Sequence, residues 1–269
     1  KSCLTFYSGS AFNFFKIVSS IIDKIRMKML NKKFLSSTEL KCIAIIAMTI
    51  DHIAFTFVSP ESLLYFIMRF IGRLTAPIMS FFIVEGFRHT RNLKNYFFRM
   101  IIFAVISQPF YFLMVFKRTP QNIFEFLMNL NVMFNFCIGL IILKIISGNL
   151  RTEKKIILIA VCFAFSDLCD WSYIIPAWIL IFFLIKNKDK RTVAFISISI
   201  ILIIFKYLSE YDNFLNFSFQ CGVISAIFLI NSFNFVKNQY HLLKKWFFYI
   251  YYPLHMAVIC ILYFLKNSL

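Results

Sequence analysis

The stretch LKCIAIIAMTIDHIAFTFVSP, residues 40–60, is apolar enough to span a bilayer, yet it carries Asp51 and His52 side by side. An ionisable group in a spanning helix costs at least about 2.5–3.5 kcal/mol on insertion scales, so such groups usually mark function. Both residues lie roughly 17 Å into the predicted helix, near mid-bilayer. Neighbouring helical side chains diverge by about 100°, so the two share a depth without facing each other. Each is either a reactive group or a structural bond to another helix.

The next apolar stretch, YFIMRFIGRLTAPIMSFFIVEGFRHT, contains Arg69 and Arg73 four residues apart and therefore on one helix face. Two arginines in an apolar helix require an anionic partner, and Asp51 is the nearest candidate. Arg73 either pairs with Asp51 as a structural element or stabilises a ligand phosphate or a developing oxyanion. We interpret Arg69 as structural. Pro77 is predicted to kink this helix and to open a cavity beside Arg73.

The end of the same stretch combines Glu85 and His89 with the cations Arg88 and Arg91. A basic helix end of this kind either anchors the helix at the membrane surface or grips a phosphorylated cofactor, because arginine forks match phosphate oxygens. Both interpretations stay open from the residues alone.

The last apolar stretch, WFFYIYYPLHMAVI, places a second histidine, His255, near mid-depth beside Tyr252 and Pro253. Pro253 releases the carbonyl of Tyr249 from its helical bond, and a polar group or water must compensate. Further polar residues gather at the predicted outer ends of other spans: Asn131, Asp167, Asp170 and Tyr173. They either line an entrance for an acceptor or are solvated loop ends.

The composition indicates the elements that must position these groups. Of 269 residues, 60% are hydrophobic and 15% charged, far from the balance of a soluble domain. Runs of helix length recur, so we predict an all-α, polytopic transmembrane helix bundle of about nine spans, within a range of eight to ten. The predicted spans are 40–58, 63–87, 97–116, 130–147, 155–167, 171–186, 191–208, 218–235 and 246–265.

The net charge of +17 is explained mainly by topology. Of the 29 Lys and Arg, 23 fall in the N-terminal segment and in alternate loops, which predicts a cytoplasmic N-terminus. A nucleic-acid partner is therefore not expected. The seven cysteines show no metal-ligand spacing, and we interpret them as small packing residues, with no metal site.

Two regions are predicted. Residues 1–38 form an N-terminal extension, either an amphipathic interfacial helix or non-native sequence before a true start at Met27 or Met29. Residues 39–269 form the transmembrane domain.

Three stretches together resemble the TraX family of bacterial membrane proteins: LKCIAIIAMTIDHI, RFIGRLTAPIMSFFIVEGFRHT and YIYYPLH. The resemblance covers about residues 39–265. It implies a multi-pass protein of the bacterial cytoplasmic membrane, associated with acetylation of pilin and grouped with membrane acyltransferases that use cytoplasmic acetyl-CoA. The chain departs from the family pattern at Thr75-Ala76 and around DWSYIIPAW, differences that bear on the acceptor pocket more than on the chemistry.

The resemblance implies an O- or N-acetyltransferase domain with acetyl-CoA as donor and no metal. It places the catalytic roles on His52, as base or transient acetyl carrier, with Asp51, Arg73 and His255. Coenzyme A would be held by Arg88, Arg91 and Lys94, near Glu85 and His89. A peptide, glycan or lipid-linked acceptor would meet Asp170, Tyr173, Asn131 and Tyr252.

Two alternatives use the same residues differently. A transporter or flippase would bind substrate or carry protons through these polar groups without bond chemistry. A non-catalytic assembly factor would have little need for polar groups at membrane depth. Loss of acetyl transfer in a His52→Ala variant separates the enzyme from both.

Overall fold

A computed structural model describes residues 35–210, 219–233 and 243–268. The predicted extension 1–38 lies outside these ranges up to residue 34. Within them the chain is helical, with two isolated β-bridges and no strand. The helices are α2 (Ser37–Phe57), α3 (Leu63–Gly72), α4 (Thr75–His89), α5 (Leu93–Phe116), α6 (Ile123–Leu127), α7 (Val132–Ser147), α8 (Thr152–Ser166), α9 (Ile174–Leu184), α10 (Lys188–Glu210), the 3₁₀ turn η1 (Phe219–Cys221), α12 (Gly222–Asn231) and α13 (Leu243–Ser268).

The predicted all-helical membrane architecture is confirmed. Each predicted span contains helix, and four helical segments in the described part of the chain are long and apolar enough to cross a membrane: Ser37–Phe57, Leu63–His89, Leu93–Phe116 and Trp246–Ser268. Three shorter apolar helices accompany them: Val132–Ser147, Ile174–Leu184 and Phe219–Asn231. The number of about nine spans and the cytoplasmic N-terminus stay predictions.

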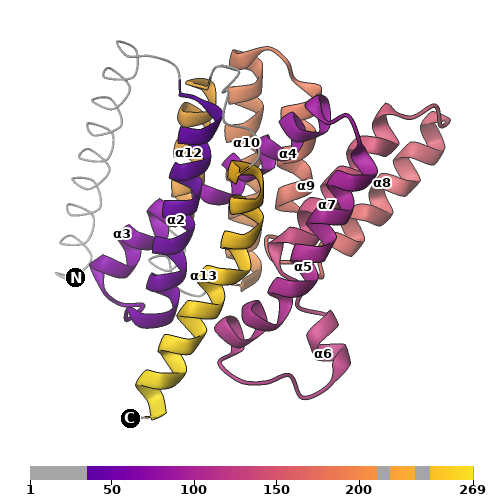
Figure 1. Cartoon of the computed structure of the whole chain (residues 1–269). Helices are drawn as coiled ribbons and strands as arrows, with labels where there is room; N and C mark the ends of the chain where they lie inside the picture. Colours follow the sequence, from indigo (N-terminus) through magenta and orange to yellow (C-terminus); the bar gives the residue numbers. More distant parts are fainter. Residues whose placement is uncertain (1–34, 211–218, 234–242, 269) are drawn as a thin grey trace.

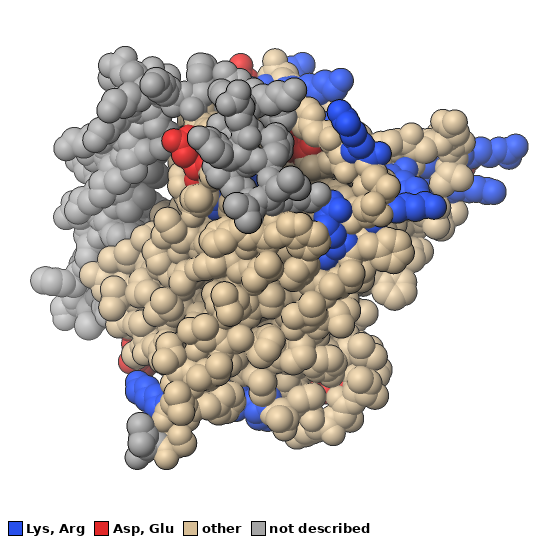
Figure 2. Space-filling model, in the orientation of Figure 1, with Lys and Arg blue, Asp and Glu red and all other residues tan. Residues whose placement is uncertain are grey.

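Charged residues are unevenly distributed over the surface. Figure 2 shows Lys and Arg gathered at the upper end of the molecule, a broad uncharged band below, and few charges at the lower end. In Figure 1 the C-terminus of α13 and the short helix α6 lie at that lower end. There Arg118 donates hydrogen bonds to Glu125 and holds the pKa of that carboxyl below its ordinary value. The uncharged band is the surface expected of a bilayer-embedded protein.

Helix α4 lies at the centre of the bundle, where it packs against α2, α7, α9 and α12 (Figure 1). Helix α2 contacts α3, α4 and α13. The first turn of α2 is fixed by a capping box: Ser36 Oγ accepts from the Glu39 backbone N–H, and Glu39 accepts from the Ser36 N–H. These contacts place one face of α2 toward the interior along its whole length.

The second predicted span is a helical segment, Leu63–His89, interrupted by a two-residue turn. Helix α3 ends at Gly72, and α4 begins at Thr75 after a turn at Arg73–Leu74. Pro77 explains the position of the break, because it has no N–H to bond the Arg73 carbonyl and its ring crowds that group. The break turns the end of α3 toward the interior of the bundle.

Gly72 allows α3 to approach α2 closely. A Cβ at this position would lie within 2.1 Å of Asp51 Oδ1, so even alanine cannot be added without moving Asp51. Gly222 makes a similar approach possible, since a Cβ there would lie 2.2 Å from the Phe70 carbonyl oxygen. Small residues at such crossings are typical of helix packing in membranes.

We therefore expect Gly72→Ala to destabilise the protein by about 1–3 kcal/mol, the usual cost of forcing extra atoms into a packed site. The melting temperature of the purified protein in detergent should fall by several degrees. Gly148→Ala is the matched control, because its Cβ would meet only backbone oxygens at 3.3 and 3.6 Å. Equal melting temperatures for the two variants would contradict the close approach of α3 to α2.

Candidate functional site

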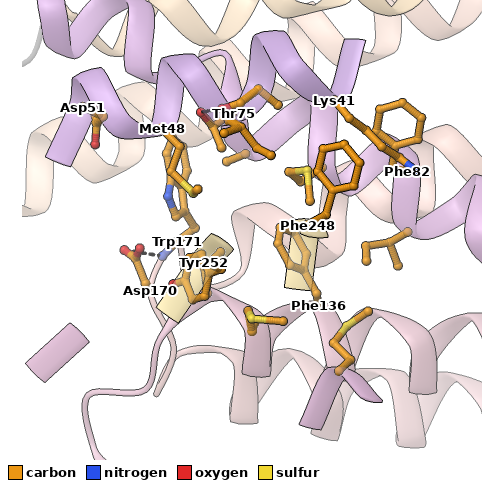
Figure 3. Close-up of a pocket in the computed structure, with 18 of the residues that line it drawn as sticks. Lys41, Met48, Asp51, Thr75, Phe82, Phe136, Asp170, Trp171, Phe248 and Tyr252 are labelled. Carbon is orange, nitrogen blue, oxygen red and sulfur yellow. Dashed lines mark hydrogen bonds between the residues drawn. The ribbon is translucent and has the colours of Figure 1, made fainter. Parts of the chain in front are cut away.

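A cavity of about 1320 Å³ lies among α2, α3, α4, α5, α7, α13 and the loop before α9. Figure 3 shows Lys41 and Phe82 toward one end and Asp170 and Trp171 toward the other. His52 and Arg73 both line this cavity. Asp51 lines it as well, so the structure brings three of the four sequence-predicted catalytic residues together in one chamber.

Helix α2 forms one wall through residues that recur every three or four positions. Lys41, Ile45, Met48 and His52 all line the cavity, and this spacing places them on one face of an α-helix. Lys41 and His52 are eleven residues apart, about 16 Å along the helix axis. This face of α2 therefore carries a cation at one end of the cavity and an imidazole deep inside it.

His52 is hydrogen-bonded to His255, with 2.8 Å between His52 Nδ1 and His255 Nε2. The two rings are nearly parallel, and His255 is buried with 6% of its surface exposed. His255 Nδ1 in turn lies 2.8 Å from the carbonyl oxygen of Tyr251, one turn earlier in α13. Two intramembrane histidines separated by 203 residues therefore form a single chain of hydrogen bonds.

Asp51 makes its ion pair with Arg69, not with Arg73. Arg69 Nη1 lies 2.6 Å from Asp51 Oδ2, and Asp51 is 8% exposed. The Arg69 guanidinium also lies over the ring of Phe219, 5.2 Å from its centroid. Asp51 and His52 therefore bond to different helices, as their divergent directions on α2 require. Asp51 therefore does not orient the His52 ring. The His52 nitrogen Nδ1 is hydrogen-bonded to His255 instead.

Arg73 follows the last residue of α3 and is 7% exposed. Its guanidinium carbon lies 5.0 Å from the ring centroid of Trp171 and 4.9 Å from that of Phe219. Cation–π contacts of this kind stabilise a guanidinium away from water. Arg73 is thus a buried cation on the cavity wall, held between two aromatic rings.

The residues at the basic end of the cavity are only partly those predicted to bind the cofactor. Arg91 and His89 line it, together with Lys41 and Arg99. Lys41 Nζ lies 4.7 Å from the Phe82 ring centroid and 5.4 Å from that of Phe248. The Lys and Arg residues at this end of the cavity therefore come from α2, α5 and the loop between α4 and α5.

Three predicted cofactor residues do not line the cavity: Arg88, Lys94 and Glu85. Arg88 donates to the carbonyl oxygens of Phe182 and Phe183 near the end of α9 and forms an ion pair with Glu85. A cation at a helix C-terminus satisfies carbonyls that lack helical partners. Arg88 thus links α4 to α9.

The other end of the cavity contains Asp170, Trp171 and Tyr252. The backbone of Trp171 and Ser172 has positive φ angles of 65° and 44°, which is uncommon for residues other than glycine. The buried Asn135 amide holds this turn by donating to the carbonyl oxygens of Asp170 and Ser172, at 3.0 and 2.7 Å. This clamp keeps Trp171 against Arg73.

The other two predicted acceptor residues do not line the cavity. Asn131 is fully buried, caps α7 through the Met133 N–H, and donates to the Ala104 carbonyl. Tyr173 immediately precedes α9, where its ring packs edge-on against Phe205. In the described part of the chain, no group of three or more His, Cys, Asp or Glu is close enough to hold a metal ion.

Sequence reasoning missed Lys41 and Asn135. Lys41 had a usable signal, because its distance of eleven residues from His52 places both on one helix face. Asn135 had none, since its partners are backbone carbonyls 35 and 37 residues away.

Comparison with known proteins identifies the group to which the chain is related. The family described as TraX protein matches residues 36–263. A probable fimbrial assembly protein FimC, serogroup H1, from Dichelobacter nodosus is 34% identical over 232 residues, which cover 84% of this chain and 94% of the relative. No solved structure matches. The chain therefore belongs to the TraX family.

Proposed function

We propose that this protein is a membrane acetyltransferase that moves an acetyl group from acetyl-CoA to an amine or hydroxyl of an acceptor. The observation that supports this proposal is that His52, Arg73 and a set of cations line one cavity. Transfer between two molecules requires both reacting groups to be held beside one base. The volume of about 1320 Å³ exceeds the roughly 300–1,000 Å³ typical for a single drug-sized ligand. There is room for donor and acceptor together.

The donor would enter at the basic end of the cavity. Lys41, Arg91 and Arg99 converge on this end from separate segments, and cations in that arrangement suit the phosphates of coenzyme A. Met48 and Phe136 line the cavity further inside. Such flexible and aromatic side chains suit the thin, mostly apolar arm that carries a thioester. The residues present therefore fit acetyl-CoA as donor substrate.

The reaction would take place at His52. Its imidazole takes the proton from the acceptor amine or hydroxyl while the acceptor nitrogen or oxygen bonds to the acetyl carbonyl carbon. Arg73 stabilises the negative charge on the carbonyl oxygen. The carbon–sulfur bond then breaks, and His52 returns its proton to the departing thiolate. The products are the acetylated acceptor, free coenzyme A thiol and a neutral imidazole.

The acceptor would occupy the end of the cavity lined by Asp170 and Tyr252. The relative named as a probable fimbrial assembly protein supports an acceptor used in building a surface fibre, either a peptide or a glycan, free or lipid-linked. A protein with this role would reside in the bacterial cytoplasmic membrane, with the basic end toward the cytoplasm.

We expect His52→Ala to abolish acetyl transfer, because general bases contribute about 10²–10⁴-fold to such rates. Membranes from expressing cells would be incubated with acetyl-labelled acetyl-CoA, and label counted in protein, lipid and carbohydrate. Ile46→Ala is the matched control, since Ile46 is on the same helix and 59% exposed. Label that does not depend on His52 would contradict the proposal. Substrate flux that depends on His52 without labelling would indicate a transporter.

We expect Lys41→Met to weaken coenzyme A binding about tenfold, since a hydrogen bond to a charged group contributes roughly 1.5–3 kcal/mol. Lys94→Met, which removes an exposed cation outside the cavity, should leave binding unchanged. Titration calorimetry of the purified protein with coenzyme A measures both. The reverse result, with Lys94 important and Lys41 not, would place the donor on the α4–α5 loop surface.

A further inference from the structure

The hydrogen bonds around His255 have only one direction that satisfies every partner. The carbonyl oxygen of Tyr251 can only accept, so the proton of this bond must be on His255 Nδ1. In a neutral imidazole the other nitrogen, Nε2, then carries a lone pair and accepts. The proton between the two histidines is therefore on His52 Nδ1.

This assignment holds while His255 is neutral, and its surroundings favour that state. His255 is buried, and in the described part of the chain its hydrogen bonds are to His52 and to the backbone of Tyr251 and Tyr252, with no carboxylate among them. A buried cation without a charged partner is strongly unfavourable. With one proton on Nδ1, His52 keeps the lone pair of its Nε2 free to accept a proton.

We propose that His255 is a positioning residue that fixes His52 in the Nδ1–H tautomer, so that Nε2 acts as the base in the cavity. Neutral histidine in water prefers the opposite tautomer, with the proton on Nε2, which cannot accept a proton there. This inference rests on the proposed function, and it gives His255 a role through His52 in place of the catalytic role that the family resemblance implies. It also explains why His255 is hydrogen-bonded on both nitrogens although it does not line the cavity.

A second hydrogen bond between α2 and α13 helps to keep the two histidines at the same level. Thr49 Oγ1 lies 2.9 Å from the Ile45 carbonyl and 2.7 Å from Tyr251 Oη. Because the threonine proton is used on the carbonyl, the tyrosine hydroxyl donates to Thr49. The hydrogen bond lies one helical turn from the His52–His255 bond, and Thr49→Val removes it while leaving both imidazoles and the Tyr251 carbonyl in the sequence.

The tautomer is measured directly by ¹⁵N spectroscopy of purified full-length protein labelled at histidine. The chain has four histidines, so the His52 signals are assigned by their loss in His52→Gln. We expect wild-type His52 to be protonated at Nδ1, and His255→Leu to move the proton mainly to Nε2. His255→Gln should retain the wild-type tautomer, because its amide oxygen can accept from His52 Nδ1. A wild-type His52 protonated at Nε2 overturns the inference.

Kinetics supply the second readout. His255→Leu should lower kcat by about 10²-fold or more with little change in KM for acetyl-CoA, since a base in the wrong tautomer is ineffective. His255→Gln should recover at least a tenth of the wild-type kcat. Thr49→Val should keep both the tautomer and kcat, while lowering the melting temperature slightly.

The two proposals fail separately. A His255→Leu variant that is monodisperse but retains the wild-type kcat, or a Thr49→Val variant that loses as much activity, overturns the positioning role. The expected tautomers in a protein that transfers no acetyl group would support the role of His255 and contradict the proposed function alone.

Discussion

The position of α2 against its neighbours depends on one constraint: a polar or ionisable side chain buried among helices needs a hydrogen-bonding partner. Asp51 finds it in Arg69 of α3, and His52 finds it in His255 of α13. A single layer at mid-length of α2 thus fixes two other helices. Apolar packing tolerates rearrangement more readily than this layer does, because losing one partner leaves a buried charge or donor uncompensated.

The cavity follows from how this layer is built. The Asp51–Arg69 pair holds α3 against α2 at Gly72, and the chain must turn at once to continue as α4. Arg73 is the first residue of this turn, and it lines the cavity as Arg69 does. Trp171 completes the cavity wall, in a backbone conformation that Asn135 maintains. Arg73 is therefore held in place by residues that have no direct role in the chemistry.

Sequence patterns predicted the helices, the membrane environment and the depth of the polar groups, because hydropathy and spacing determine all three. They did not predict which polar side chains bond to one another. Arg69 and Arg73 share a predicted face and a similar depth, so face and depth alone cannot decide which of them meets Asp51. Nor could spacing reveal the His52–His255 contact, which joins the first and last described apolar helices. Nor could spacing reveal that Arg88 bonds backbone carbonyls of α9.

The separation of Asp51 from His52 bears on what the imidazole can do. Asp51 is paired with Arg69, and in the described part of the chain no hydrogen bond joins a carboxylate to His52 or His255. A proton taken up by His52 would therefore not be stabilised by a neighbouring anion. A proton carrier needs its charged form to persist through a conformational change, whereas a general base holds a proton only until the leaving group accepts it. The arrangement of these two adjacent residues is better suited to brief protonation than to storage of charge.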